Sequence, residues 1–186
     1  MSTATVPATL TDLTGTWALD PSHSRVGFVA RHAMVTKVRG AFNEFEGTAT
    51  IGSDINDTAI ALTIQVGSVD TRNADRDGHL KSGDFLEIEK YPTITFTSTS
   101  TKAVGSTLEV TGDLTIKDTT KSITIPFEFE GAALDPFGNV RVGFEGSVAI
   151  NRRDYGVTWN AALETGGVLV SDKITLEFEV SAIKSA

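Results

Sequence analysis

The chain has 186 residues, a formal net charge of −8 at pH 7 and no cysteine. Its length predicts one domain with a core large enough to enclose a cavity. The negative charge argues against nucleic acid as a partner and against attraction to an anionic membrane surface, while the lack of cysteine excludes disulfides, thiolate metal sites and cysteine nucleophiles.

The N-terminal segment is rich in Thr, Ala and Ser. We therefore predict a flexible tail over residues 1–15 and a single domain over residues 16–186. The tail has neither the basic nor the apolar stretch of a secretory signal, and no apolar run approaches the roughly 20 residues that span a bilayer. We expect a cytoplasmic protein without stable membrane insertion.

From Trp17 onward, apolar residues fall at alternate positions, which is the period of a β-strand. The alternation occurs over 17–19, 26–30, 38–42, 60–66, 94–96, 108–116, 123–129, 140–150 and 174–180. Turn residues separate these segments, and no long amphipathic helix is evident. The pattern predicts about eight strands joined by hairpins, in an all-β antiparallel sheet that closes as a barrel or packs as a sandwich.

The segment 66–92 breaks this pattern, because a charged block over 70–81 follows an apolar run. The apolar spacing within 85–91 predicts one or two helical turns, with Ser82 or Asp84 as the N-cap. In a closed β-structure such an excursion covers one end. The segment is therefore predicted to be a lid with a short helix.

Four stretches of the chain form a signature in a fixed order. In chain order they are Asp20-Pro21-Ser22-His23-Ser24 with Val26, Phe28 and His32; Gly40-Ala41-Phe42 with Phe45 and Gly47; 68–73, 76–82, Asp84-Phe85 and Tyr91-Pro92; and 151–156 with Val170-Ser171-Asp172. Together they resemble the YceI-like family of polyisoprenoid-binding, lipocalin-like proteins. The resemblance runs from about residue 17 to residue 183.

The resemblance implies an eight-stranded antiparallel lipocalin-like barrel with a short helical lid segment. It also implies a long-chain isoprenoid ligand, such as a polyprenyl quinone or polyprenyl phosphate, held in the interior by a carrier, storage or sequestering protein. No cofactor is expected besides that lipid. A homodimer is implied as well, with Phe137 and Trp159 as candidate exposed contacts.

The inward apolar positions of the predicted strands are the candidate tunnel. Periodicity alone favours an ordinary core, and the resemblance shifts the interpretation to a ligand tunnel. The residues are Val26, Phe28, Phe42, Leu62, Ile64, Ile94, Phe96, Leu114, Ile125, Phe127, Val142, Phe144, Leu176 and Phe178.

The candidate headgroup residues are His32, Arg72, Asn73, Arg76 and Asp77. His32 continues the alternation of the strand before it, so we expect it to point inward near a barrel end. There it either bonds a backbone carbonyl or donates to a quinone carbonyl or polyprenyl headgroup. The other four either form ion pairs on the rim or contact the headgroup.

Metal and catalytic motifs are weak. The acidic positions over 73–84 approach the spacing of a calcium loop but depart from it at the first and last ligands, and the histidines at 23, 32 and 79 lack the paired spacing of a zinc site. We predict no metal and no catalytic residue. The alternatives are an enzyme that acts on a small apolar substrate in the same cavity, with His32 or a rim carboxylate as acid/base, and a filled barrel that serves as an interaction module.

Overall fold

The structure is a computed structural model that describes residues 6–164 and 166–185. Its strands are β1 (Gly15–Leu19), β2 (Arg25–His32), β3 (Thr36–Phe42), β4 (Phe45–Ile51), β5 (Thr58–Gln65), β6 (Val69–Asp70), β7 (Thr93–Val104), β8 (Thr107–Ile116), β9 (Thr119–Leu134), β10 (Val140–Asn151) and β11 (Lys173–Lys184). In the described residues there is one α-helix, α1 (Ala74–Lys81), with 3-10 turns η1 (Leu10–Asp12), η2 (Pro21–His23), η3 (Val66–Ser68) and η4 (Arg152–Tyr155).

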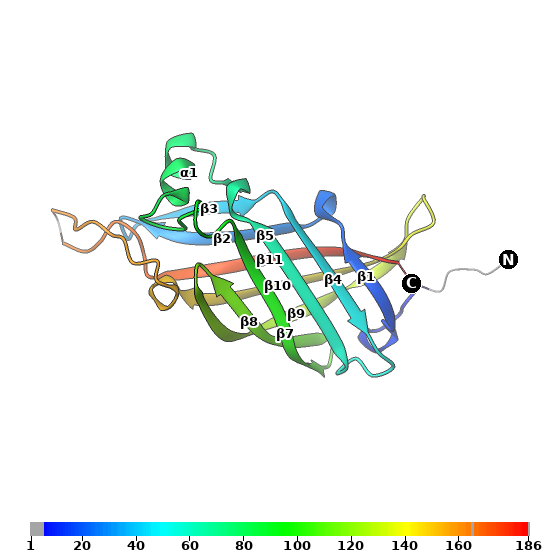
Figure 1. Cartoon of the computed structure of the whole chain (residues 1–186). Coiled ribbons are helices and arrows are strands. Elements are labelled where there is room, and N and C mark those ends of the chain that lie inside the picture. Colours follow the sequence, from blue (N-terminus) through cyan, green and yellow to red (C-terminus); the bar gives the residue numbers. More distant parts are fainter. Residues whose placement is uncertain (1–5, 165, 186) are drawn as a thin grey trace.

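The strands form one antiparallel sheet that closes on itself (Figure 1). The order is β1-β4-β5-β7-β8-β9-β10-β11, and β1 pairs with β11 to complete the ring. The predicted eight-stranded antiparallel barrel is confirmed. Strands β2, β3 and β6 continue the sheet from β11 beside α1.

One edge of β11 has two partners. Residues 175–179 pair with β2, and residues 182–184 pair with β1, while the other edge pairs with β10. The backbone of Ser181 lies at this fork: its N–H donates to Ser24 Oγ at 2.9 Å, and its carbonyl accepts from the N–H of Asp20 at 2.8 Å. These bonds give the backbone N–H and carbonyl of Ser181 partners where the sheet divides.

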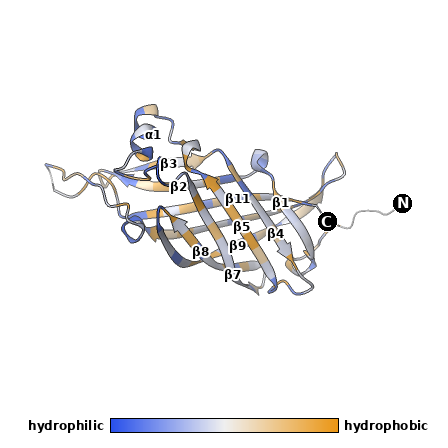
Figure 2. Ribbon diagram, viewed as in Figure 1, coloured by the Kyte–Doolittle hydropathy of each residue, from blue (hydrophilic) through white to orange (hydrophobic). Residues whose placement is uncertain are grey.

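Hydrophobic and hydrophilic residues alternate along the strands (Figure 2), and most of the buried side chains are apolar. Three interior glycines make room for a phenylalanine ring from the neighbouring strand, which would overlap a Cβ at the glycine position. The pairs are Gly40 with Phe28, Gly112 with Phe96, and Gly146 with Phe127. These phenylalanine rings therefore pack directly against the glycine backbone of the neighbouring strand, where the sheet coils.

The predicted flexible tail over 1–15 is wrong for the part that the structure shows, and residues 1–5 lie outside the described residues. Leu10 is 3% exposed and Leu13 is fully buried. The indole Nε1–H of Trp17 donates to the Leu13 carbonyl at 2.8 Å. Leu10 on the 3-10 turn η1 and Leu13 directly after it are buried because they cover the barrel end at the start of β1.

The predicted helix after Ser82 is also wrong, because α1 lies on the charged block and successive turns occupy 83–90. The side chain of Asn73 accepts the N–H of Arg76 at 3.0 Å and caps the helix at its N-terminus. Ser82 ends it, since its N–H and Oγ both bond the His79 carbonyl. The apolar side chains that follow reach the core through turns, and Phe85 is 6% exposed.

The pairs of glycine and phenylalanine predict that two Gly→Ala substitutions change the free energy of unfolding in opposite directions. Gly40→Ala should lower the free energy of unfolding by about 1–3 kcal/mol, because its Cβ overlaps the Phe28 ring. Gly78→Ala, inside α1 with no heavy atom within 4 Å of the added Cβ, should raise it by about 0.5–1 kcal/mol. Urea unfolding measures both, and equal effects would contradict the packing described here.

Candidate ligand-binding cavity

The barrel contains an apolar cavity of 140 Å³. Side chains from every barrel strand and from β2 contribute to its wall. It lies in the half of the barrel that holds β1 and the C-terminal part of β11, away from α1. The cavity therefore lies in the part of the barrel that the pairing of β1 with β11 closes.

The predicted tunnel residues divide into two groups. Those that line the cavity are Val26, Leu62, Phe96, Ile125, Phe127, Val142, Phe144 and Phe178. Those outside its wall are Phe28, Phe42, Ile64, Ile94, Leu114 and Leu176. The second group belongs to the half nearer α1, where the rings of Phe28 and Phe42 pack 5.6 Å apart. The cavity is thus shorter than the barrel-long tunnel that the sequence predicts.

Several wall residues were missed from sequence. Gly47 and Ala49 come from β4, Leu13 comes from the N-terminal segment that was predicted to be a tail, and Trp17 comes from the first predicted strand segment. The small side chains of β4 leave volume inside the barrel. Alternation over 45–51 could have revealed this strand, but glycine and alanine make the period weak.

The partly buried hydroxyl groups in the wall are already hydrogen-bonded. Ser24 Oγ exchanges two bonds with the backbone of Ser181, and Thr58 Oγ1 donates to the Ile55 carbonyl. Glu179 lines the cavity but is an exposed residue. No buried side-chain nitrogen or oxygen among the described residues lacks a partner. The wall therefore offers a ligand apolar contact and no free buried polar group.

The predicted headgroup residues on the lid bond mainly within the lid, and Thr71 is the shared partner of Arg76 and Asp77. Asp77 Oδ1 accepts the N–H of Thr71 at 2.9 Å and its hydroxyl at 2.6 Å. The Arg76 guanidinium donates to Thr71 Oγ1 at 2.8 Å and to the Thr71 carbonyl at 2.7 Å. Asn73 caps α1, and Arg72 is exposed with a φ of 66°. None of these residues lines the cavity.

His32 is exposed, so the expectation that it points inward is wrong. It ends β2 and forms an isolated bridge with Val170. The strand has left the barrel wall at this point, so the inward alternation no longer applies. The acid/base role considered for His32 inside the barrel loses its structural basis.

The two candidate dimer contacts differ in exposure. Phe137 is 87% exposed at the tip of the β9–β10 hairpin. Trp159 is partly buried, and its ring packs 4.7 Å from His79 and 5.3 Å from Phe85. The expectation of an exposed Trp159 is therefore wrong. Trp159, His79 and Phe85 form an aromatic cluster in which the lid packs against the segment after β10.

Arg152 is a buried cation that holds the segment between η4 and β11. Its guanidinium donates to the carbonyls of Val157 at 2.8 Å, Ser171 at 2.9 Å and Val170 at 3.3 Å. Burial lowers the pKa of Arg152, partly opposed by the charge of Asp172. The backbone carbonyls thus satisfy a guanidinium whose ion pair with Asp172 is long, at 3.8 Å.

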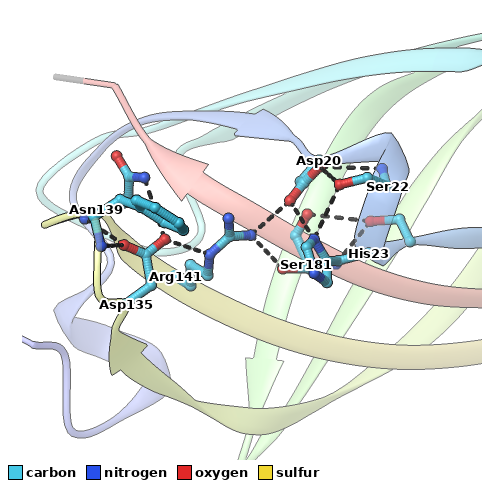
Figure 3. A network of polar contacts seen from close by, with 9 residues as sticks. Asp20, Ser22, His23, Asp135, Asn139, Arg141 and Ser181 are labelled. Atoms are coloured by element: carbon cyan, nitrogen blue, oxygen red, sulfur yellow. Dashed lines mark hydrogen bonds and ion pairs between the residues drawn. The ribbon is translucent and has the colours of Figure 1, made fainter.

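A polar network surrounds the Arg141 guanidinium (Figure 3). Arg141 Nη1 contacts Asp20 Oδ2 at 2.6 Å, and its Nε contacts Asp135 Oδ2 at 2.7 Å. His23 Nδ1 lies 2.8 Å from Asp20 Oδ2, and Ser22 Oγ donates to Asp20 Oδ1 at 2.7 Å. The network joins the end of β1 to β10 and to the β9–β10 hairpin.

Arg141 and Ser22 hold the pKa of Asp20 well below its ordinary value. Hydrogen bonding, foremost from the Asn139 N–H and then from Arg141, lowers the pKa of Asp135 from 3.8 to about 2. The two carboxylates raise the pKa of Arg141 in turn. Each group is therefore charged in the folded protein at neutral pH.

Groups of three or more His, Asp or Glu side chains that could hold a metal are not found in residues 6–164 and 166–185. Within the same residues, the helix present is neither long nor apolar enough to cross a bilayer.

A closed antiparallel barrel with an apolar internal cavity places the chain among the small β-barrels whose interior has room for one ligand. The chain belongs to the YceI-like family, whose domain model matches residues 17–182. The resemblance found in the sequence is confirmed.

Related proteins agree with this assignment. A UPF0312 protein of Staphylococcus aureus is 40% identical over 170 residues, which cover 89% of this chain and 95% of the relative. The Campylobacter jejuni YceI protein is 29% identical, covers 84% of this chain and 90% of its own, and superposes with a TM-score of 0.72. A polyisoprenoid-binding domain from Saccharophagus degradans is 17% identical with a TM-score of 0.70, covers 90% of this chain and 98% of its own, and shares the fold.

The Arg152 contacts predict a loss of stability that its neighbour does not share. Arg152→Ala should lower the free energy of unfolding by about 1–3 kcal/mol, because buried carbonyls lose their donors. Arg153→Ala removes an exposed ion pair with Asp172 and should cost at most about 1 kcal/mol. Urea unfolding of the two variants provides the comparison, and an equal loss would argue against Arg152 as the anchor.

The Asp20 and Asp135 carboxylates predict stability that depends on acid pH. Since their pKa values are lower in the folded than in the unfolded chain, their contribution to stability is complete above about pH 5 and decreases progressively as pH falls toward 2 and below. Arg141→Met should lower stability at pH 7 and flatten this decline, because the main cause of the low Asp20 pKa is removed. Urea unfolding across pH 2–7 tests it, with the exposed Lys90→Met as control. An unchanged slope in Arg141→Met would contradict the assignment.

Proposed function

We propose that this protein binds an isoprenoid lipid with part of its chain inside the barrel cavity, and carries, stores or sequesters that lipid. The observation that carries the proposal is the apolar cavity within the barrel. A wall of aliphatic and aromatic groups without a free buried polar group favours a hydrocarbon chain. The shared fold of the Saccharophagus degradans polyisoprenoid-binding domain supports the same ligand class.

The volume limits how much of the chain fits without rearrangement. An apolar cavity of roughly 150 Å³ binds a benzene ring, whereas pockets for larger ligands measure roughly 300–1,000 Å³. A cavity of 140 Å³ accepts a short terminal segment, in which each buried CH₂ contributes about 0.8 kcal/mol. A longer chain requires Phe28 and Phe42 to move from the half nearer α1.

The polar head of the ligand stays at or beyond the rim in this proposal, since the wall has no free polar partner for it. Asn73, Arg76 and Asp77 already bond within the lid. The side chain of Arg72 forms no hydrogen bond or ion pair recorded within the described residues. Arg72 is therefore the rim residue best able to meet an anionic head such as a phosphate. Because the cavity lies in the half of the barrel away from α1, a chain whose head is at Arg72 reaches it only when Phe28 and Phe42 move.

The test is organic extraction of the purified protein followed by mass spectrometry, with native mass spectrometry of the intact protein. A stoichiometric isoprenoid or isoprenoid quinone supports the proposal and identifies the ligand. An empty extract from protein that also fails to bind an added polyprenyl quinone would overturn it.

Two Ala→Phe variants locate the binding. Ala49→Phe places a ring about the size of the cavity inside it, and should abolish co-purification of the lipid. Ala59→Phe, on the exposed face of the adjacent β5, should retain the lipid. Circular dichroism establishes that both are folded, and retention of lipid by folded Ala49→Phe would place binding elsewhere.

A further inference from the structure

An exposed apolar surface lies at the lid end of the molecule. We define the hairpin surface as Met34, Val35 and Val168, which are 63%, 74% and 37% exposed. The β2–β3 turn and the loop before β11 meet there, since the N–H of Ala33 donates to the Leu169 carbonyl at 2.8 Å. Figure 1 shows both segments projecting from the same end, opposite the β9–β10 hairpin.

The backbone of this turn is unusual for its residues. Ala33 has a φ of 50° and Met34 a φ of 66°, both in the left-handed region that hairpin turns usually fill with Asn and Gly. The fold thus holds a long apolar side chain at a strained tip in solvent. Strain that persists at an exposed tip is a reason to look for a function there.

Cations flank the apolar tip. Arg31 lies opposite Lys37 in the β2–β3 ladder, and Arg39 follows on the same outer face. None of the three belongs to an ion pair between described residues. Like charges in direct cross-strand register destabilise a sheet. Glu164 is an exposed carboxylate in the neighbouring loop.

We propose that the hairpin surface docks this protein reversibly on an anionic lipid bilayer. Met34, Val35 and Val168 enter the interface, and Arg31, Lys37 and Arg39 face the anionic headgroups, a combination that binds peripheral proteins to such surfaces. The net charge of −8 argues against attraction of the whole molecule to an anionic surface. Because salt screens charges that lie more than about 8–10 Å apart, the cations beside the hairpin surface determine the electrostatic attraction at the point of contact.

The functional reason for docking rests on the proposed function, because an isoprenoid lipid resides in a bilayer and has to be extracted from it. The docking residues are separate from the cavity, whose wall contains none of them. Vesicle binding and lipid co-purification are therefore independent readouts, and either can fail alone.

The experiment is flotation of the purified protein with vesicles of phosphatidylcholine alone or mixed with phosphatidylglycerol. The protein should bind the mixed vesicles preferentially, and added salt should weaken binding. Met34→Ser with Val35→Ser should lower the affinity by about tenfold or more. Lys37→Gln should lower it by about fivefold. Phe137→Ser, which removes the 87% exposed ring at the opposite end, should leave it unchanged.

Three outcomes would overturn the proposal. One is equal binding, or none, to the two vesicle types. Another is an equal loss in Phe137→Ser and in the hairpin variant. The third is a parent protein that does not bind vesicles but self-associates in gel filtration, together with a hairpin variant that no longer self-associates. That result would assign the hairpin surface to contact with a second copy of this chain. Thermal unfolding checks that each variant is folded.

Discussion

The fork in β11 is the constraint on which the rest of this structure depends. Because β1 and β2 share one edge of this strand, the sheet closes tightly at one end and spreads into β2, β3 and β6 at the other. The wide end needs a cover, which the lid and its aromatic cluster supply. At the fork itself, Ser24 and Asp20 bond the backbone of Ser181, and Asp20 also anchors the network around Arg141.

The interior follows from the same division. Towards the lid, phenylalanine rings and branched aliphatic side chains fill the barrel. Towards the closed end, Gly47 and Ala49 of β4 face inward and leave a cavity. Polar side chains in this region are either bonded to backbone or lie outside the sheet, as Arg141 does. The molecule thereby separates apolar binding inside the barrel from electrostatics on its outer surface.

Alternation of large apolar residues was enough to predict an antiparallel all-β sheet, most of its strands and the inward positions such as Phe96 and Phe178. The choice of a barrel over a sandwich, and of a cavity over a filled core, came from the family resemblance. It missed β4, because glycine and alanine at inward positions give almost no hydrophobic period. It placed the lid helix too late, because the cap formed by Asn73 outweighed the apolar spacing after Ser82. It turned His32 inward, because alternation cannot show where a strand leaves the barrel wall. Hydrogen-bond partners such as Thr71 for Asp77 depend on tertiary contacts that a linear pattern does not contain.

The pairing that closes the barrel joins residues from opposite ends of the sequence. Trp17 lies opposite Lys184, and the N–H of Ser185 donates to the Thr16 carbonyl at 2.8 Å. Contacts at such separation carry a large loop-closure entropy, so the ring is expected to close late and slowly during folding. The same proximity makes the barrel suited to circular permutation: a short linker can join these neighbours, and a new break fits at an exposed hairpin such as the one at Phe137.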